Sequence, residues 1–395
     1  MDLPNINQLE LDGKRVLLRV DFNVPFFKID RIPTEADISD DFRIRAVVPT
    51  IKLIIEKGGI PIILAHLGRP KGKRDVALSL LPIGGRLSHL LGKDVIFTED
   101  CVGERVERLC SDLKKGDVVL LENLRFHQGE ESNNAGFAKE LAVLGEVYIN
   151  EAFGDAHRAH ASIVGIPKLL PHAAGPLMTR EIEAVGRLKD NPERPLVAVM
   201  GGSKISTKID FLERFLPWVD HLLLGGALAS TLIKAQGHNI GKSFTEESML
   251  ERVSKFDFKS PKVHIPVDFI VAKEASSDAK TEVRSLDGIQ DDESIFDIGP
   301  ETRKIFAEII GQSKTVFWNG PMGMHEISIF ARGTEMTAEA VALSEGFNVV
   351  GGGDTTVIIE RLYLDHYIDF ISTGGGAMLE FLCGESLPGI EALRS

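Results

Sequence analysis

The sequence predicts two α/β domains of similar size, each a doubly wound, Rossmann-like parallel sheet, joined by a hinge helix. Short runs of Val, Ile and Leu alternate with longer stretches of helical periodicity, which is the pattern of strand–helix–strand units. In the second half, glycine clusters follow most of the apolar runs. The length of 395 residues suits two or three domains of about 150 residues each.

The first half contains five apolar runs that we expect to form strands. They are residues 15–20, 60–65, 94–97, 117–121 and 146–149. Residues 42–58 show helical periodicity and are expected to form a helix that ends at Gly58. Pro49 is the one residue in this stretch that does not suit the interior of a helix. The order of these segments predicts a parallel sheet.

The second half repeats this pattern. Its expected strands are residues 196–200, 221–224, 315–318, 348–350 and 369–372. Four of them precede the glycine clusters at 201–202, 225–226, 351–353 and 374–376. Residues 179–189 are expected to form a connecting helix that ends before the prolines of 191–195. We therefore expect domains at 1–178 and 196–384, with the linker helix and hinge at 179–195.

Composition and charge exclude several classes of protein. There are 45 Lys and Arg against 58 Asp and Glu, a net charge of −13, which disfavours a nucleic-acid or membrane partner. The 3 cysteines are too few and too scattered for a disulfide framework or a zinc site, which favours a reducing compartment. The sequence has no signal-peptide pattern, and its apolar runs are too short for a membrane helix. We expect a cytoplasmic monomer.

Arg, His and polar residues follow the expected strands of the first half. They are Asp21, Asn23, His66, Arg69, Asn123, Arg125, Asn150, His157, Arg158 and His160, with Arg43 and Arg45 at the start of the nearby helix. Ligands of open parallel sheets bind beyond the carboxyl ends of the strands, and the planar fork of Arg suits phosphate or carboxylate. This favours an anion site. Ordinary surface ion pairs are the alternative for any single Arg, and metal binding by His157 and His160 lacks a third ligand.

The second half points to nucleotide phosphates. Glycines after buried strands let backbone N–H groups approach a bulky anion, although tight turns alone would also explain single clusters. Lys204 and Lys208 follow the first cluster, four residues apart. Asp354 follows three glycines, where one carboxylate can hold a Mg²⁺ that bridges phosphates. Asn319 and Glu326, in a Gly/Pro-rich loop, can reach a ribose or a phosphate.

Standard nucleotide motifs are absent. GHNIGKS (237–243) is one residue short of a P-loop, and the segments 351–356 and 374–379 lack the last glycine of a dinucleotide fingerprint. A Rossmann dehydrogenase is therefore disfavoured, and the nucleotide must be bound in another way.

Ten motifs connect the chain with a known family. In chain order they are RVDFNVP, DFRIRAVVPTI, AHLGRP, LLENLRF, NEAFGDAHRAHAS, GGSKISTKI, GGALASTL, WNGPMG, GGGDT and STGGGA. Through them the chain resembles the phosphoglycerate kinase family along nearly its whole length. The resemblance implies that the N-terminal domain binds 3-phosphoglycerate or 1,3-bisphosphoglycerate and the C-terminal domain binds Mg-ADP or Mg-ATP. It also implies that the tail, about 385–395, returns to the first domain.

The resemblance also assigns roles to residues. The substrate-binding positions are Asp21, Asn23, Arg43, His66, Arg69, Arg125 and Arg158. The nucleotide-binding positions are Lys208, Glu326, Gly352, Gly353, Asp354 and Thr355, to which the glycine and loop arguments add Gly225, Gly226 and Asn319. The catalytic positions around the transferred phosphoryl are Arg43, Lys204, Lys208, Gly353 and Gly376. Asp354 is the expected Mg²⁺ ligand.

Some residues depart from the family pattern. The stretch 26–40 is longer than the usual turn, and Glu151, Asp155 and His325 differ from the expected residue types. None of these changes removes an assigned functional group. We expect reversible phosphoryl transfer to ADP, with no general base and with domain closure. The rival hypothesis is a catalytically silent nucleotide-binding or scaffold protein of the same architecture.

Overall fold

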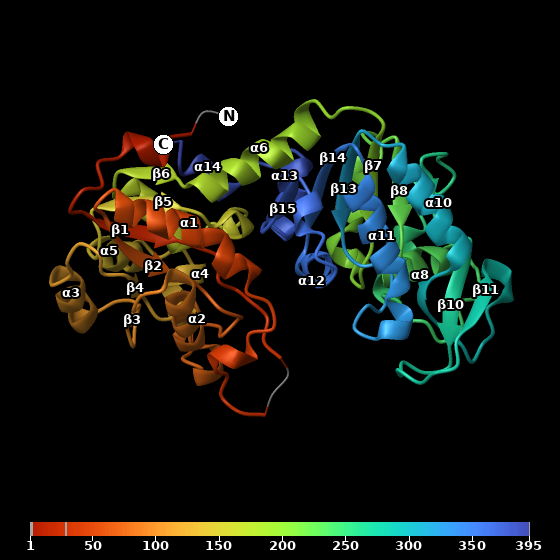
Figure 1. Ribbon diagram of the computed structural model, residues 1–395, viewed down its shortest axis with the longest axis horizontal. Coiled ribbons are helices and arrows are strands. Elements are labelled where there is room, and N and C mark those ends of the chain that lie inside the picture. Colours follow the sequence, from red (N-terminus) through yellow and green to blue (C-terminus); the bar gives the residue numbers. More distant parts are fainter. Residues whose placement is uncertain (1–2, 28–29, 395) are drawn as a thin grey trace. The chain divides into compact units, whose positions relative to one another are not determined.

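The computed structural model describes residues 3–27 and 30–394. The chain forms two compact units (Figure 1). The first contains the chain up to Glu183 together with the segment from Glu385 onward, and the second contains Ala184–Gly384. Within the first unit, Gly389 N of the C-terminal segment donates to Ala156 O at 2.8 Å. None of the described helices has the length and apolar character needed to cross a membrane.

The first unit is built on a six-stranded parallel sheet in the order β3-β4-β2-β1-β5-β6. Its strands are β1 (Arg15–Arg19), β2 (Ile60–Leu64), β3 (Ile96–Phe97), β4 (Val119–Leu120), β5 (Val147–Asn150) and β6 (His172–Ala174). The first five overlap the predicted runs, which confirms the α/β prediction for this half. The short β6, with sequence HAA, was not predicted because it has no apolar pattern.

Helices pack around this sheet (Figure 1). They are α1 (Phe42–Glu56), α2 (Leu81–Leu91), α3 (Glu104–Ser111), α4 (Gln128–Glu131), α5 (Ala135–Ala142) and α14 (Pro388–Glu391), together with the first part of α6 (Pro176–Asp190), which belongs to the second unit from Ala184 onward. Helix α1 buries Ile44, Val47 and Ile51 in the core. Pro49 lies inside α1 on its exposed face, and Gly58 follows the helix with a φ of +76°, which favours glycine.

The second unit contains another six-stranded parallel sheet, in the order β15-β14-β13-β7-β8-β9. Its strands are β7 (Leu196–Met200), β8 (His221–Leu224), β9 (Val263–His264), β13 (Thr315–Asn319), β14 (Phe347–Gly351) and β15 (Phe370–Ser372). Its helices are α7 (Ile209–Phe215), α8 (Gly226–Ala235), α9 (Leu250–Val253), α10 (Pro300–Gly311), α11 (Arg332–Leu343), α12 (Gly353–Arg361) and α13 (Gly376–Leu382). All five predicted strands are confirmed, and the two-residue β9 was missed.

A three-stranded antiparallel sheet, in the order β11-β10-β12, was also missed (Figure 1). Its strands are β10 (Asp268–Ala272), β11 (Glu282–Ser285) and β12 (Ser294–Ile298). Phe269 and Val271 of β10 pack with Ala229 and Ile233 of α8. The edge strand β11 has no buried residue, and its sequence EVRS has no apolar run of the kind that predicts a central strand.

Each parallel sheet contains a point where the strand order reverses. In the first unit it lies between β1 and β5, and in the second between β7 and β13. Ligands of doubly wound sheets bind at the carboxyl ends of the strands beside such a reversal. The topology therefore predicts one ligand site at each of these two places.

Candidate functional site

The basic residues of the first unit meet at the carboxyl edge of its sheet. Four neighbouring strands, in the order β4-β2-β1-β5, end at this edge. His66 follows β2, Arg125 lies in the 3-10 helix η4 (Leu124–Phe126) after β4, and Arg158 follows β5. The strand reversal between β1 and β5 thus falls inside a cluster of basic side chains.

Asp155 lies at the centre of this cluster and is 3% exposed. Its Oδ2 accepts from Arg19 Nη2 at 2.9 Å and lies 3.1 Å from His66 Nδ1. Its Oδ1 lies 3.8 Å from both Arg125 Nη2 and Arg158 Nε. Burial alone would raise the pKa of Asp155, but His66 and Arg19 hold this pKa well below its usual range.

The side chain of Arg125 has two nitrogen donors without a hydrogen-bond acceptor among the described residues. Its side chain is 2% exposed, and its Nη1 donates to Gly68 O at 2.9 Å. Its Nε and Nη2 have no hydrogen-bond partner among the described residues. Buried donors are costly to leave unpaired. Burial lowers the pKa of Arg125, yet a guanidinium stays charged in proteins, so an anionic ligand suits these donors.

Arg43 is positioned by the loop that follows β1. Its Nη1 lies 2.9 Å from Asp21 Oδ2 and donates to Asn23 O at 3.0 Å. The side chain of Asn23 accepts from Gly68 N at 2.9 Å, which joins this loop to the one after β2. Arg69 is exposed and has no ion pair within the described ranges.

The histidines at 157 and 160 do not form a metal site with the residues around them. Neither belongs to a group of three potential metal ligands in the described part of the chain. Burial and the nearby Arg125 lower the pKa of His160 to about 3, which keeps its ring neutral. Burial and Arg158 also lower the pKa of His157.

The second unit contains two adjoining cavities at its strand reversal. The smaller, of about 300 Å³, is lined by Gly202, Ser203, Lys204, Lys208, Asn319, Gly320, Pro321, Gly352, Gly353, Asp354 and Thr355. The larger, of about 420 Å³, is lined by apolar side chains such as Phe269, Ile298 and Met322. Gly202, Ser203, Pro321 and Asp354 line both cavities. The pair offers a polar chamber next to an apolar one.

Lys208 is held by backbone carbonyls in the smaller cavity. Its Nζ donates to Gly201 O at 2.7 Å and to Asn319 O at 3.2 Å. Burial lowers the pKa of Lys208 to about 8, with Asp354 acting in the opposite direction. Lys204 lines the same cavity and is exposed.

Glycines allow the loops around these cavities to approach one another closely. Gly226, at the start of α8, has a φ of +62°, and a Cβ there would lie 2.8 Å from both Gly202 N and Pro321 O. Gly226 lines the larger cavity. Gly225 packs against Met322 and lines neither cavity.

The start of α12 is fixed to the loop after β13. Thr355 Oγ1 accepts from Gly320 N at 2.8 Å, and Asn319 Nδ2 donates to Gly351 O at 3.0 Å. Asp354, the second residue of α12, is exposed in the wall of both cavities. A single free carboxylate beside a polar cavity fits Mg²⁺, which keeps several waters and takes its other ligands from phosphates.

Two further predicted residues, Glu326 and Gly376, lie in different parts of the second unit. Glu326 lines the larger cavity. Gly376, the first residue of α13, is exposed, lines neither cavity, and a Cβ there would meet open space.

Sequence reasoning missed residues of the larger cavity. Lys242 and Phe244 line it together with Phe296 and Asp297 of β12. Lys242 N donates to Glu293 O at 2.7 Å, so the loop after α8 runs beside β12. Burial raises the pKa of Asp297 to about 7 despite Arg303 at 2.9 Å. The sequence feature that could have revealed this wall is GHNIGKS (237–243), an imperfect P-loop that contains Lys242.

Known proteins match the chain along its whole length. The family model described as phosphoglycerate kinase matches residues 6–385. The phosphoglycerate kinase of Moorella thermoacetica is 46% identical over 392 residues, covering 98% of each chain. That of Chloroherpeton thalassium is 46% identical over 403 residues, covering 100% of each.

Solved structures agree with the sequence matches. The phosphoglycerate kinase of Coxiella burnetii has a TM-score of 0.81 and 41% identity, covering 100% of this chain and 99% of that one. The enzyme of Pyrococcus horikoshii has a TM-score of 0.89 and 32% identity, covering 99% and 98%.

Proposed function

The chain belongs to the phosphoglycerate kinase family of phosphotransferases, and we propose that each of its two units binds one of the two substrates. The first unit binds 3-phosphoglycerate or 1,3-bisphosphoglycerate, and the second binds ADP or ATP. The observation that carries this proposal is the buried Arg125, whose Nε and Nη2 have no acceptor among the described residues and lie in a basic cluster. A phosphate or carboxylate would supply that acceptor.

In the first unit, the phosphoglycerate is bound by residues that the carboxyl edge of the sheet brings together. They are Asp21, Asn23, Arg43, His66, Arg69, Arg125 and Arg158. Asp21 orients Arg43 through their contact of 2.9 Å. The exposed Arg69 adds a charge that can reach the ligand without losing a protein partner.

In the second unit, different parts of the nucleotide bind in the two cavities. The nucleoside occupies the apolar cavity, where Glu326, which lines this cavity, binds the ribose and Gly226 lets the backbone come close. The phosphates occupy the smaller cavity, with Lys208, Asn319, Gly352, Gly353 and Thr355 around them. Gly225 supports this loop by packing.

Asp354 is the protein ligand that we propose for Mg²⁺. When bound, the cation neutralises charge on the nucleotide phosphates during transfer. Asp354 lines both cavities, so its carboxylate borders the nucleoside and the phosphates alike.

The residues proposed to surround the transferred phosphoryl are Arg43, Lys204, Lys208 and the N–H groups of Gly353 and Gly376. The P–O bond of the acyl phosphate breaks, its carboxylate leaves, and a new bond forms to a terminal oxygen of ADP. Because the attacking oxygen is already ionised, no general base is needed. We infer that closure about residues 179–195 brings the substrates together and excludes water.

We further propose that the protein is a cytoplasmic monomer. The described cysteines are all free thiols, which suits a reducing compartment. The named relatives give no support to a catalytically silent binding or scaffold protein.

The test is ATP-dependent phosphorylation of 3-phosphoglycerate, coupled to NADH oxidation through glyceraldehyde-phosphate dehydrogenase, with and without Mg²⁺. We expect robust turnover that depends on Mg²⁺. Absence of turnover in a protein that still binds nucleotide would contradict the proposal and favour the silent alternative.

A further inference from the structure

A buried carboxylate lies in the middle of the basic cluster of the first unit. Asp155 contacts charged or titratable side chains from four different segments, namely Arg19 of β1, His66 after β2, Arg125 of η4 and Arg158 after β5. An acidic residue at the centre of a site for anions is unexpected, since it repels the ligand that its neighbours attract.

The contacts of Asp155 are of two kinds. Its Oδ2 is paired closely with Arg19 and His66, at 2.9 and 3.1 Å. Its Oδ1 is 3.8 Å from Arg125 and from Arg158, which is beyond hydrogen-bond distance. Asp155 therefore attracts these two guanidinium groups and orders them without using up their donors.

Other carboxylates near this cluster have different contacts. Glu131 of α4 lies 3.7 Å from Arg125 Nε, but its side chain is 41% exposed and no ion pair joins it to Arg158 in the described part of the chain. Glu130 of α4 is buried and binds Ser162, with its Oε1 accepting from Ser162 Oγ at 2.5 Å. Asp21 pairs with Arg43. Asp155 is thus the carboxylate that lies against both Arg125 and Arg158, the two arginines that the proposed function assigns to phosphoglycerate.

We propose that Asp155 is a positioning residue that also sets the affinity of the first unit for phosphoglycerate. It holds His66, Arg125 and Arg158 in place and partly neutralises the charge of the two arginines, so that the ligand is bound loosely enough to be released. This inference rests on the proposed function. Its physical basis is Coulombic, because a ligand anion placed on Arg125 and Arg158 lies within a few ångströms of the Asp155 carboxylate.

The experiment is isothermal titration calorimetry of Asp155→Asn, which keeps the shape of the side chain and removes its charge. We expect the Kd for 3-phosphoglycerate to fall on the order of tenfold. The Kd for inorganic phosphate should fall in the same direction, and that for Mg-ADP should stay unchanged. In turnover, the KM for 3-phosphoglycerate should fall while kcat does not rise, a split that a merely structural role would not produce.

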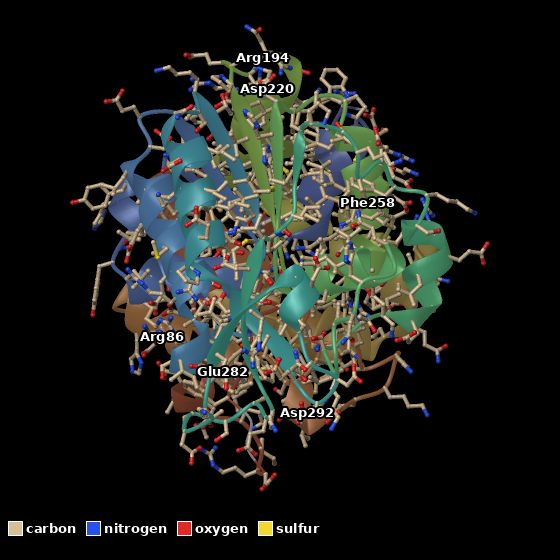
Figure 2. All side chains as sticks on the ribbon, turned by 90° about the vertical axis from the view of Figure 1, so that its right-hand side faces the viewer. Arg86, Arg194, Asp220, Phe258, Glu282 and Asp292 are labelled. Carbon is tan, nitrogen blue, oxygen red and sulfur yellow. The ribbon has the colours of Figure 1, made fainter. Side chains whose placement is uncertain are left out.

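Asp220→Asn is the matched control for the change in net charge. Asp220 accepts from Arg194 Nη1 with both oxygens at 2.9 Å and belongs to the second unit (Figure 2). This variant should leave the Kd for 3-phosphoglycerate within about twofold of the parent value.

Asp155→Ser is a second neutral variant, and thermal unfolding at increasing 3-phosphoglycerate concentration measures affinity even in a less stable protein. If both variants bind 3-phosphoglycerate as the parent does, or more weakly, the inference is wrong. Failure of both to fold would also overturn it, since Asp155 would then be a structural residue. A parent protein that binds no 3-phosphoglycerate would instead contradict the proposed function.

Discussion

The two candidate sites bind anions with different parts of the chain. The site in the first unit consists of side chains, with Arg43, Arg125 and Arg158 converging on the strand reversal between β1 and β5. The site in the second unit depends on backbone, because glycines at several loops let main-chain groups come close and Lys208 is bound by two carbonyls. The first site therefore depends on charge, and the second depends on the shape of the backbone.

The largest expected effect is on Arg43, which tests the role of side-chain charge in the first site. Arg43→Ala should lower kcat by about 10³-fold, because Arg43 is proposed to stabilise charge on the transferred phosphoryl. The KM values should change far less. Steady-state kinetics in the coupled assay measure both, and the exposed Lys52→Ala on the same helix is the control. An unchanged kcat would remove Arg43 from the catalytic set.

Substitution of Gly226 tests the importance of backbone shape in the second site. Gly226→Ala should lower the free energy of unfolding by about 2 to 4 kcal/mol, because a Cβ would collide with Gly202 and Pro321 at a positive φ. Gly311→Ala, where a Cβ meets no atom within 4 Å, should be neutral or slightly stabilising.

Chemical denaturation followed by tryptophan fluorescence measures this difference. Both tryptophans, Trp218 and Trp318, belong to the second unit, so the signal reports on the unit that carries the change. Equal stability of the two variants would show that the close approach at Gly226 is not required.

The two sites should also respond differently to pH. Lys208, with a pKa of about 8, loses its charge as the pH rises above that value, whereas arginines stay protonated. The kcat/KM for ATP should therefore fall about tenfold per pH unit between pH 8.5 and 9.5. The Kd for 3-phosphoglycerate in the absence of nucleotide, measured by calorimetry over the same pH range, should stay nearly constant, because Lys208 belongs to the second unit. A parallel weakening of 3-phosphoglycerate binding over this range would contradict the distinction.

The smallest expected effect is on Lys242, in the wall of the larger cavity. Lys242→Met should raise the KM for ATP about fivefold, as expected for one exposed charged contact, and leave the KM for 3-phosphoglycerate unchanged. Lys255→Met, which changes an exposed lysine near Glu251, is the control. An unchanged KM for ATP would show that Lys242 does not touch the nucleotide.

The sequence predicted the central strands because they are buried on both faces and read as continuous apolar runs, such as IPIIL in β2 and LVAVM in β7. It failed where this signal is weak. Strand β9 has two half-buried residues, and β11 has no buried residue. Their existence depends on pairing with β8 and β10, which local sequence does not reveal.

The site residues could likewise be predicted where the local sequence carries a signal, and not where they depend on contacts between distant segments. His66, Arg125 and Arg158 lie in the segments that follow neighbouring strands, so topology predicts that they meet, whereas Arg43 lies at the start of α1. Phe244 and Asp297 escaped prediction because the wall they form requires the loop after α8 to run beside β12. Asp155 was noticed as a departure, but its contact with Arg19 was not foreseen, since Arg19 lies within β1.

The most direct test of the division of substrates between the units is calorimetric titration of two variants, each with 3-phosphoglycerate and with Mg-ADP. Arg69→Ala and Asp354→Ala both change exposed residues, so neither should disturb the fold. We predict that Arg69→Ala weakens 3-phosphoglycerate binding and leaves Mg-ADP binding unchanged, and that Asp354→Ala does the reverse. If either variant weakened both ligands equally, or if the two effects were exchanged, the assignment of one substrate to each unit would be contradicted.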